Sequence, residues 1–296
     1  MAFQNSGIFI INKPFQWTSN DVIRKIKSNC KFKKIGHAGT LDPLATGILP
    51  ILVNDSTKYF DYFQTFKKSY LAEIKFGFST SSYDLEGDID AKTDNIPQNI
   101  DLIKEKISYF IGSIKQVPPK YSAIKKNGKR LYDYARNDED IEIESREVEV
   151  SEIKIIDWKT PILKVIINCS SGFYVRSFAN DLGKKLGSLA VLTSLSRINY
   201  GPFEIKDSIN IENINPIEKK LISIDSIFLS NKKLVFDVDM EKSYYNGKVF
   251  TSENLKLSSL KEQDIKIYNS NDEFIGLLTY DNTKKFWKPK NIIRLY

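Results

Sequence analysis

The chain has 296 residues, of which 41% are hydrophobic and 27% charged, a composition typical of a globular protein with a main domain and a smaller one. Its 44 Lys and Arg exceed its 37 Asp and Glu to give a net charge of +7, which favours an acidic partner such as RNA, although a lysine-rich composition can also reflect an A+T-rich genome. One His and two Cys are too few for a closed zinc site or a disulfide framework, and no apolar run is long enough to cross a bilayer.

The sequence also lacks the motifs of several common enzyme classes. It contains no glycine-rich phosphate loop and no G-x-S-x-G serine elbow. The N-terminus has neither a basic start nor a small-residue cleavage site, so it does not resemble a secretory signal. We therefore expect a cytoplasmic protein whose chemistry relies on Asp, Glu, Arg, Tyr and Lys, without a metal or a cofactor.

The N-terminal part of the chain alternates apolar strands with helices. Residues 7–12 form an apolar run that predicts a buried strand, and Thr18 with an acidic residue three positions later predicts the start of a helix. Residues 36–50 contain three Gly and two Pro but no apolar period, which predicts a shaped loop. A helix is predicted over 55–66, and alternating apolar and polar residues predict a strand over 68–77.

The centre of the chain continues this mixture. Residues 78–98 are polar and rich in turn-forming residues, and the apolar residues from Leu102 to Ile111 follow helical spacing. The later elements are predicted as strands over 148–158 and 162–169, a helix over 174–186 and a strand over 189–200. Because helices and strands alternate irregularly, we predict an α+β fold on a largely antiparallel sheet rather than a doubly wound one.

The pattern changes after residue 203. Residues 204–233 show no clear period and are predicted to form a connector packed on the main domain. Short apolar runs separated by turn signals such as Asn246-Gly247 and Asn271-Asp272 predict a small all-β module over 234–296. The predicted organisation is a domain over 1–203, a connector and a C-terminal module.

The loop at 36–50 carries the most informative candidate for chemistry. It holds Asp42, which precedes a proline, and His37, the only histidine of the chain. An Asp-Pro pair often does no more than shape a turn. A carboxylate on a loop fixed by Gly and Pro can also be catalytic, and this segment alone leaves both interpretations open.

Two further residues are equally ambiguous. Tyr70 on its predicted strand can be a core aromatic residue, and Arg176 near a helix start can be a surface or capping residue. An arginine beside a carboxylate would, however, keep that carboxylate ionised even in a buried place.

A basic segment over 120–136 interleaves Lys and Arg with Tyr and is followed by an acidic stretch over 137–149. Cations can follow a phosphate backbone and aromatic rings can stack on exposed bases, but a solvated surface would have the same composition. Lys120, Lys129 and Arg130 are the candidates for RNA contact in this segment.

Taken in chain order, these segments resemble the TruB family of bacterial tRNA pseudouridine synthases. The resemblance covers residues 6–203 and rests on G-I-F-I-I-N-K-P, K-I-G-H-A-G-T-L-D-P-L-A-T-G-I-L-P, K-S-Y-L-A-E-I-K-F-G, Q-V-P-P-K-Y-S-A-I-K and C-S-S-G-F-Y-V-R-S-F-A-N-D-L-G. A G-H-x-G-[ST]-L-D-P loop followed downstream by Y-[VI]-R and D-L-G is highly specific to this family.

The resemblance implies a role for each candidate. Asp42 matches the family's nucleophilic aspartate, Arg176 the arginine paired with it, and Tyr70 the tyrosine that stacks on the target uracil. His37 matches the histidine that helps to displace the target nucleotide. Further substrate or RNA contacts are implied for Gly36, Gly39, Tyr174, Leu195, Lys120, Lys129 and Arg130.

A fold, a reaction and a partner are implied as well. The family has a mixed, mostly antiparallel sheet flanked by helices, usually followed by a PUA-type RNA-binding module, here residues 234–296. The implied reaction converts uridine to pseudouridine in the T loop of tRNA, at position 55, by base flipping and without a metal or a cofactor. The implied partner is the T stem-loop, gripped by a thumb segment over 120–150, and a monomer with no membrane or obligatory protein partner is expected.

Some features depart from the family pattern or leave alternatives open. Many members carry an acidic residue where this chain has Ser81, which leaves Asp84 as the matching acid of that loop, and the C-terminal module matches PUA modules only weakly. A non-catalytic RNA-binding protein and a base-excising glycosidase that uses Asp42 are the rival classes. Guide-dependent relatives that modify ribosomal RNA with partner proteins raise a separate question of substrate.

Overall fold

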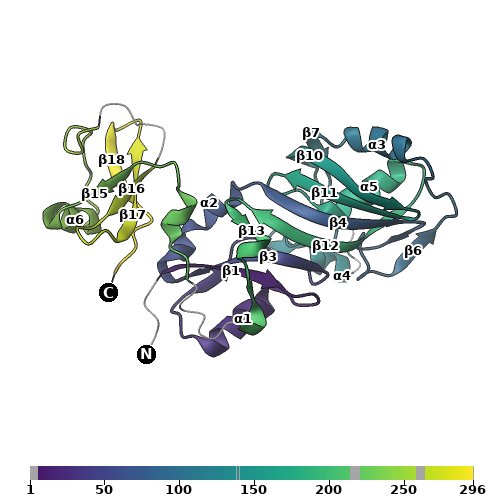
Figure 1. Ribbon diagram of the computed structural model, residues 1–296, viewed down its shortest axis with the longest axis horizontal. Helices are drawn as coiled ribbons and strands as arrows, with labels where there is room; N and C mark the ends of the chain where they lie inside the picture. The colour runs from purple at the N-terminus through teal and green to yellow at the C-terminus, as the bar shows by residue number, and fades with distance from the viewer. Residues whose placement is uncertain (1–5, 138, 140, 214–220, 258–263, 296) are drawn as a thin grey trace.

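The structure is a computed structural model that describes residues 6–137, 139, 141–213, 221–257 and 264–295. These residues form a large mixed sheet of ten strands and a separate sheet of four strands near the C-terminus (Figure 1). The large sheet has the order β14-β1-β3-β12-β4-β11-β10-β7, with β2 and β13 as additional short strands. Most neighbouring strands in it are antiparallel, which confirms the predicted α+β class.

The first strand and helix form as predicted. Strand β1 (Gly7–Lys13) is almost entirely buried, and helix α1 (Ser19–Asn29) follows it. The Thr18 side chain accepts a hydrogen bond from the Asp21 backbone N–H, while the Asp21 carboxylate accepts from the Thr18 N–H. This reciprocal capping box satisfies two donors at the start of the helix.

The segment over 36–50 is a loop only in its middle, so the prediction of one continuous loop is wrong at both ends. Strand β2 (Ile35–His37) precedes the loop, and strand β3 (Ala45–Val53) begins directly after it. Strand β3 lies inside the large sheet, between β1 on one side and β12 and β2 on the other, and nearly all of its residues are buried. A strand buried on both faces shows no polar–apolar alternation, so its period was not visible in the sequence.

The next elements agree with the predicted ones only in part. The expected helix over 55–66 is a 3₁₀ turn followed by a short α-helix, and the turn-rich region contains a small hairpin, β5 and β6. An edge strand, β7, was not predicted. The bounds are η1 (Asn54–Tyr59), α2 (Phe60–Gln64), β4 (Lys68–Phe76), β5 (Phe78–Thr80), β6 (Ile89–Lys92), α3 (Ile100–Ser108) and β7 (Gly112–Gln116).

The basic segment contains a small hairpin and a short helix, and the long strands that follow it complete the sheet. The bounds are β8 (Lys125–Lys126), β9 (Lys129–Arg130), α4 (Leu131–Arg136), β10 (Arg146–Lys159), β11 (Ile162–Cys169), α5 (Val175–Lys185) and β12 (Ala190–Tyr200). Gly187, which follows α5, has φ +66°, the left-handed conformation expected of a glycine that ends a helix.

Helices cover one face of the large sheet. The main hydrophobic core joins side chains of the strands to Val22 and Ile26 of α1, Ile103 of α3, and Phe178 and Leu182 of α5. Burial of such aliphatic and aromatic groups contributes about 1.5–3 kcal/mol for each side chain. This core fixes the position of α5, whose first turn carries Arg176.

The opposite face of β1 and β3 packs against η1, α2 and the C-terminal part of the chain. Ile8, Ile48 and Leu52 share a second core cluster with Tyr59 and with residues from the C-terminal sheet. The bounds of the elements after β12 are β13 (Phe203–Glu204), η2 (Ile205–Asp207), β14 (Ile209–Asn210), η3 (Ile211–Asn213), η5 (Ile224–Ile227), β15 (Lys233–Val235), α6 (Val238–Tyr245), β16 (Ile265–Tyr268), β17 (Phe274–Asp281) and β18 (Phe286–Lys290).

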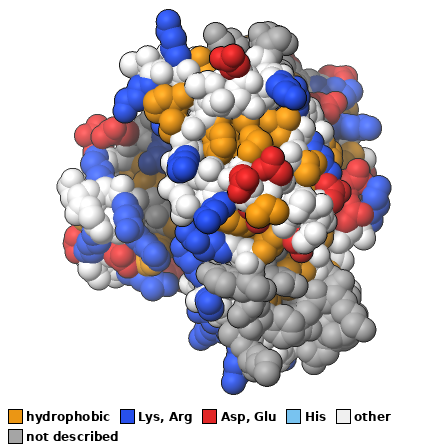
Figure 2. All heavy atoms as spheres, turned by 90° about the vertical axis from the view of Figure 1, so that its left-hand side faces the viewer, with side chains coloured by type: hydrophobic (Ala, Val, Ile, Leu, Met, Phe, Trp, Pro, Cys, Tyr) orange, Lys and Arg blue, Asp and Glu red, His pale blue; other side chains and the backbone are white. Residues whose placement is uncertain are grey.

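The C-terminal module is a sheet of four strands, β15-β16-β17-β18, with its own core. It also contains helix α6, which the expectation of an all-β module did not include. The Tyr59 hydroxyl donates to the Asn291 carbonyl oxygen at 2.7 Å, and the Lys58 ammonium donates to the Ile292 carbonyl oxygen at 2.7 Å. On the face of this end that Figure 2 shows, Lys and Arg side chains are interspersed with acidic and hydrophobic ones.

Gly47 is essential to the pairing of β3 with β12. It has φ +97°, and a Cβ atom added there would lie 2.4 Å from the Arg197 carbonyl oxygen. Gly112 has the same φ of +97°, but a Cβ atom there would meet nothing within 4 Å. Alanine substitutions at the two positions therefore distinguish the cost of the strained φ from the cost of a steric collision.

We predict that Gly112→Ala lowers the free energy of unfolding by about 1 kcal/mol because of the strained φ. Gly47→Ala should cost a further ~2 kcal/mol because the new methyl group overlaps β12. Chemical denaturation of both variants measures this difference. Equal losses would show that β3 and β12 can separate without cost.

Candidate active site

A cavity of about 470 Å³ lies where the loop before β3, the start of α5 and residues 122–124 meet. It is lined by six of the residues predicted from the sequence, which come from distant parts of the chain: Gly39, Asp42, Tyr70, Tyr174, Arg176 and Leu195. The tertiary structure thus brings the three proposed catalytic residues, Asp42, Tyr70 and Arg176, to the lining of one cavity.

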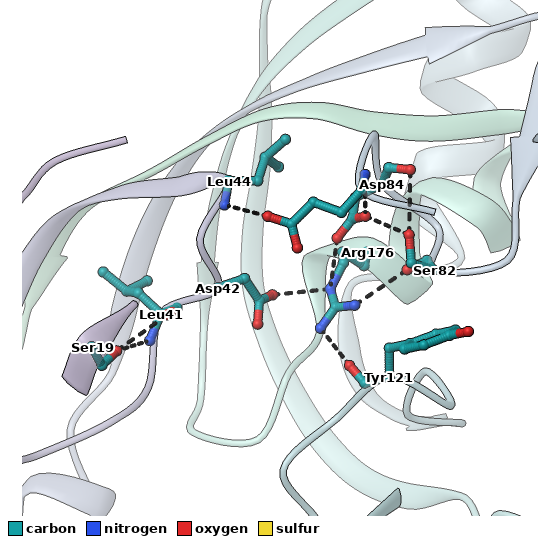
Figure 3. Close-up of polar contacts among 9 residues, drawn as sticks. Ser19, Leu41, Asp42, Leu44, Ser82, Asp84, Tyr121 and Arg176 are labelled. Carbon is teal, nitrogen blue, oxygen red and sulfur yellow. Dashed lines mark hydrogen bonds and ion pairs between the residues drawn. The ribbon is translucent and has the colours of Figure 1, made fainter. Parts of the chain in front are cut away.

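The loop that carries Asp42 is tied to its surroundings on both sides. The Ser19 hydroxyl donates to the Leu41 carbonyl oxygen at 3.1 Å and accepts from the Leu41 N–H at 3.0 Å. On the other side of Asp42, the Leu44 N–H donates to the Glu86 carboxylate at 3.0 Å (Figure 3). These bonds fix the backbone immediately before and after Asp42, so its carboxylate has a defined position.

Lys13 also holds the Asp42 loop, through a hydrogen bond to the loop backbone. Its side chain is fully buried at the end of β1, and its ammonium group donates to the carbonyl oxygens of Pro14, Trp17 and Pro43. Burial lowers the pKa of Lys13 to about 8, although the nearby Asp42 carboxylate acts in the opposite direction. Lys13 was not among the residues predicted from the sequence, although a lysine that directly follows an apolar run was a usable sign of a buried charge.

Asp42 forms an ion pair with Arg176. The Arg176 Nε lies 3.0 Å from the Asp42 Oδ2, and the Asp42 side chain remains 37% exposed while that of Arg176 is only 6% exposed. The guanidinium group also donates to the carbonyl oxygens of Ser82, at 3.3 Å, and Tyr121, at 2.9 Å. The carboxylate is therefore accessible to a ligand in the cavity, whereas its partner is fixed in the protein.

A second carboxylate, that of Asp84, shares Arg176. The Asp84 Oδ2 lies 3.5 Å from Arg176 Nε, and its side chain is 1% exposed. Asp84 also accepts hydrogen bonds from the Ser82 hydroxyl and the Glu86 N–H, and Figure 3 shows Arg176 between the two carboxylates. The negative charge of Asp84 offsets the positive charge of the buried guanidinium, so Asp42 is not the only anion that compensates Arg176.

Tyr70 and Leu195 come from the middle of the sheet, on the neighbouring strands β4 and β12. Burial raises the pKa of Tyr70, and the Arg197 side chain, to which it is hydrogen bonded, opposes that rise. Arg197 is 1% exposed and donates to the carbonyl oxygens of Ile48, at 2.7 Å, and Gly39, at 3.2 Å. Arg197 was not among the residues predicted from the sequence, because β12 also contains Thr, Ser and Asn and an arginine among them gave no distinctive signal.

Tyr174 is the N-cap residue of α5 and is held through its backbone. The Gln116 side-chain amide donates to the Tyr174 carbonyl oxygen at 3.1 Å and accepts from its N–H at 2.8 Å. Burial raises the pKa of Tyr174, so its hydroxyl stays protonated at neutral pH.

The remaining predicted residues lie outside the lining of this cavity. His37 is on β2, where burial lowers its pKa, and its Nδ1 has no hydrogen-bond partner among the described residues. Gly36 precedes it on the same strand. In the basic segment, Lys129 is paired with Glu139 at 2.6 Å and Arg130 donates to the Tyr132 hydroxyl at 2.6 Å. Lys120 is exposed just before the residues that line the cavity.

In the part of the chain that the structure describes, no three His, Cys, Asp or Glu residues are grouped in a way that could hold a metal ion. None of the described helices is long and apolar enough to cross a membrane.

The fold is similar to that of chains in solved H/ACA RNP structures, at low sequence identity. A chain in the structure of an H/ACA RNP bound to a substrate RNA containing 2′-deoxyuridine matches 98% of this chain and 85% of its own length, with a TM-score of 0.68 and 18% identity. A chain of the archaeal box H/ACA sRNP covers 98% of this chain and 89% of its own length, with a TM-score of 0.65 and 17% identity.

Relatives at higher identity identify the family. The tRNA pseudouridine synthase B of Clostridium kluyveri is 38% identical over 92% of this chain and 94% of its own length. That of Ureaplasma urealyticum is 46% identical over 71% of this chain and 93% of its own length. These relatives place the chain in the pseudouridine synthase class of enzymes. Residues 27–175 match the model of the TruB family pseudouridylate synthase N-terminal domain, and the chain belongs to this family.

We predict that Asp84→Asn slows catalysis although Asp84 does not line the cavity. Loss of the buried charge leaves Arg176 compensated by Asp42 alone, which draws Asp42 more tightly into the ion pair. We expect kcat to fall about 10-fold or more and the free energy of unfolding to fall by about 3 kcal/mol. Asp88→Asn, which changes an exposed carboxylate of the same loop, is the control. Equal kcat values for the two variants would contradict the role assigned to Asp84.

Proposed function

We propose that this enzyme converts uridine to pseudouridine in the T loop of tRNA, at position 55. The observation that carries the proposal is the half-exposed Asp42 carboxylate beside the buried Arg176 guanidinium, in a cavity with Tyr70 and Leu195. The relatives of Clostridium kluyveri and Ureaplasma urealyticum, named tRNA pseudouridine synthase B, support tRNA as the substrate.

The chemistry follows from the position of the charges. The ion pair with Arg176 holds the Asp42 carboxylate at the cavity, where it can act as a nucleophile or a base. Asp42 can add to C1′ of the ribose, add to C6 of the uracil, or remove the C2′ proton, and all three routes use the same carboxylate. The base then turns within the cavity and is rejoined to C1′ through C5.

The target uridine has to leave the folded T loop before it reaches Asp42. Such base flipping costs a few kcal/mol, roughly, for unstacking. In our proposal the extruded uracil stacks on Tyr70 beside Leu195, and Tyr174 bounds the same cavity. His37, which lies on β2 next to the Asp42 loop, occupies the position that the nucleotide has left.

The thumb segment over 120–150 is proposed to hold the RNA through Lys120, Lys129 and Arg130. Its base is part of the site, because the Tyr121 carbonyl oxygen accepts from Arg176 and Ser122 lines the cavity. Movement of the thumb onto RNA would therefore act directly on the position of Arg176. This contact supports a coupling between RNA binding and the catalytic ion pair.

The same proposal assigns a function to each part of the chain. Residues 1–203 form the catalytic domain, 204–233 connect it to the C-terminal module, and the PUA-like module over 234–296 adds an RNA contact. We expect the enzyme to act in the cytoplasm on tRNA, as a monomer without an obligatory protein partner.

We predict that Asp42→Asn binds unmodified tRNA with unchanged affinity but forms no pseudouridine, because the amide is neither nucleophilic nor basic. Incubation of each protein with unmodified tRNA, followed by mapping of pseudouridine, tests this. Free uracil and abasic RNA from the wild-type protein would instead indicate a glycosidase. Normal turnover by the variant would rule out the proposed role of Asp42.

We also predict that tRNA affinity falls steeply with salt, because phosphate contacts release counterions. Lys129→Gln and Arg130→Gln should each reduce the slope of log K against log[salt] by about 0.7–0.9. Lys104→Gln, on the exposed side of α3, serves as the matched control. Slopes that match this control would show that the thumb does not hold the phosphate backbone.

A further inference from the structure

Lys68 is a buried cation in the active-site cavity that the mechanism above does not use. It begins β4, is 6% exposed and lines the same cavity as Asp42 and Tyr70. Its ammonium group donates to the Phe66 carbonyl oxygen at 3.2 Å and lies 4.6 Å from the centre of the Tyr200 ring. Among the described residues, no carboxylate lies within ion-pair distance of it.

The two other buried cations that line the cavity, Arg176 and Arg197, have more polar partners than Lys68. Arg176 is compensated by Asp42 and Asp84. Arg197 donates to the carbonyl oxygens of Ile48 and Gly39. A lysine ammonium has three donors, and within the described chain only one of those of Lys68 has a hydrogen-bond acceptor.

Such a group is unfavourable for the free protein. A buried charge without a partner loses its hydration and gains no ion pair in return. Burial and the nearby Arg197 charge accordingly lower the pKa of Lys68 to about 8. An anion that enters the cavity would restore the missing interaction, so the lysine is a receptor for negative charge.

We propose that Lys68 stabilises the negative charge that develops on the uracil ring when the bond between C1′ and N1 breaks. The inference rests on the proposed function, in which the uracil stacks on Tyr70. Lys68 and Tyr70 are two residues apart on β4, so their side chains lie on the same face of the strand. A base on the Tyr70 ring is thus within reach of the Lys68 ammonium group.

The step balances without any external reactant. When the C1′–N1 bond breaks, its electron pair stays on the base, and the resulting anion shares its charge between N1, O2 and O4. Departure of N1 leaves C1′ short of electrons. Asp42 makes up this deficit either by forming an ester bond to C1′ or by removing the C2′ proton. After the bond between C1′ and C5 forms, the C5 proton leaves and N1 takes up a proton, so Lys68 itself transfers nothing.

A phosphate of the RNA backbone is the other anion that could meet Lys68. The depth of the ammonium group favours the base, because a phosphate diester carries a nucleotide on each side and stays near the surface. The two assignments predict different experimental results. A phosphate contact changes the affinity for RNA, whereas a contact to the leaving base changes the rate of bond cleavage.

The test compares Lys68→Met with Lys67→Met, which removes an exposed lysine from the residue just before β4. Cleavage of the C1′–N1 bond is followed under single-turnover conditions in the full protein, and the melting temperature is measured alongside. We expect Lys68→Met to slow cleavage about 100-fold, as loss of a single charge-stabilising donor does in other active sites. Its melting temperature should equal or exceed that of the wild type, because an unpaired charge has been removed. Lys68→Gln should show the same loss of rate.

Affinity for tRNA is measured separately, with Lys68→Met placed in the inactive Asp42→Asn protein. We expect an unchanged Kd and an unchanged salt slope. A weaker Kd with a salt slope smaller by about 0.7 would assign Lys68 to a backbone phosphate and overturn the proposal.

A substrate with 5-fluorouridine at the target position supplies an independent test. Fluorine withdraws electrons and makes the base a better leaving group, so the loss caused by Lys68→Met should shrink to about 10-fold or less. An equal loss on both substrates, or a rate for Lys68→Met equal to that of Lys67→Met, would overturn the proposal. Wild-type protein that forms no pseudouridine in the T loop would instead refute the proposed function, so the two failures are distinguishable.

Discussion

The structure depends on the buried guanidinium group of Arg176. It joins the loop that carries Asp42, the hairpin loop that carries Asp84, and the backbone of the thumb at Tyr121. A guanidinium removed from water needs a compensating charge, and Asp84 supplies it from a fully buried position. The Asp42 carboxylate is thereby oriented by its ion pair with Arg176 and still accessible from the cavity. The same group therefore satisfies a folding requirement and a chemical one.

Two other buried cations extend this arrangement around the cavity. Lys13 and Arg197 donate mainly to backbone carbonyl oxygens, and both hold the Asp42 loop, at Pro43 and Gly39. Bonds to carbonyl groups fix the backbone without neutralising the cations. Lys68 adds a charge that has no carboxylate partner among the described residues. A cavity of this kind suits a reaction in which a neutral base leaves as an anion.

Much of the fold could be predicted from the sequence, for reasons that differ between elements. The alternation over β4 and the capping box of α1 are local patterns, so they predicted their elements directly. Strand β3 was interpreted as loop because burial on both faces removes any alternation, and its Gly and Pro resemble turn residues. Strand β7 is short, mostly exposed and lies at the sheet edge, where sequence patterns are weak.

The sequence by itself determined the family and the residue types at the centre of the site, because the motifs around Asp42, Tyr70 and Arg176 are continuous stretches of chain. It did not determine the sharing of Arg176 with Asp84, the support from Lys13 and Arg197, or the lack of a carboxylate partner for Lys68 among the described residues. Those are relations between side chains on separate strands and loops. Only the tertiary structure decides them, because burial and the distance between charges do not exist until the sheet has formed.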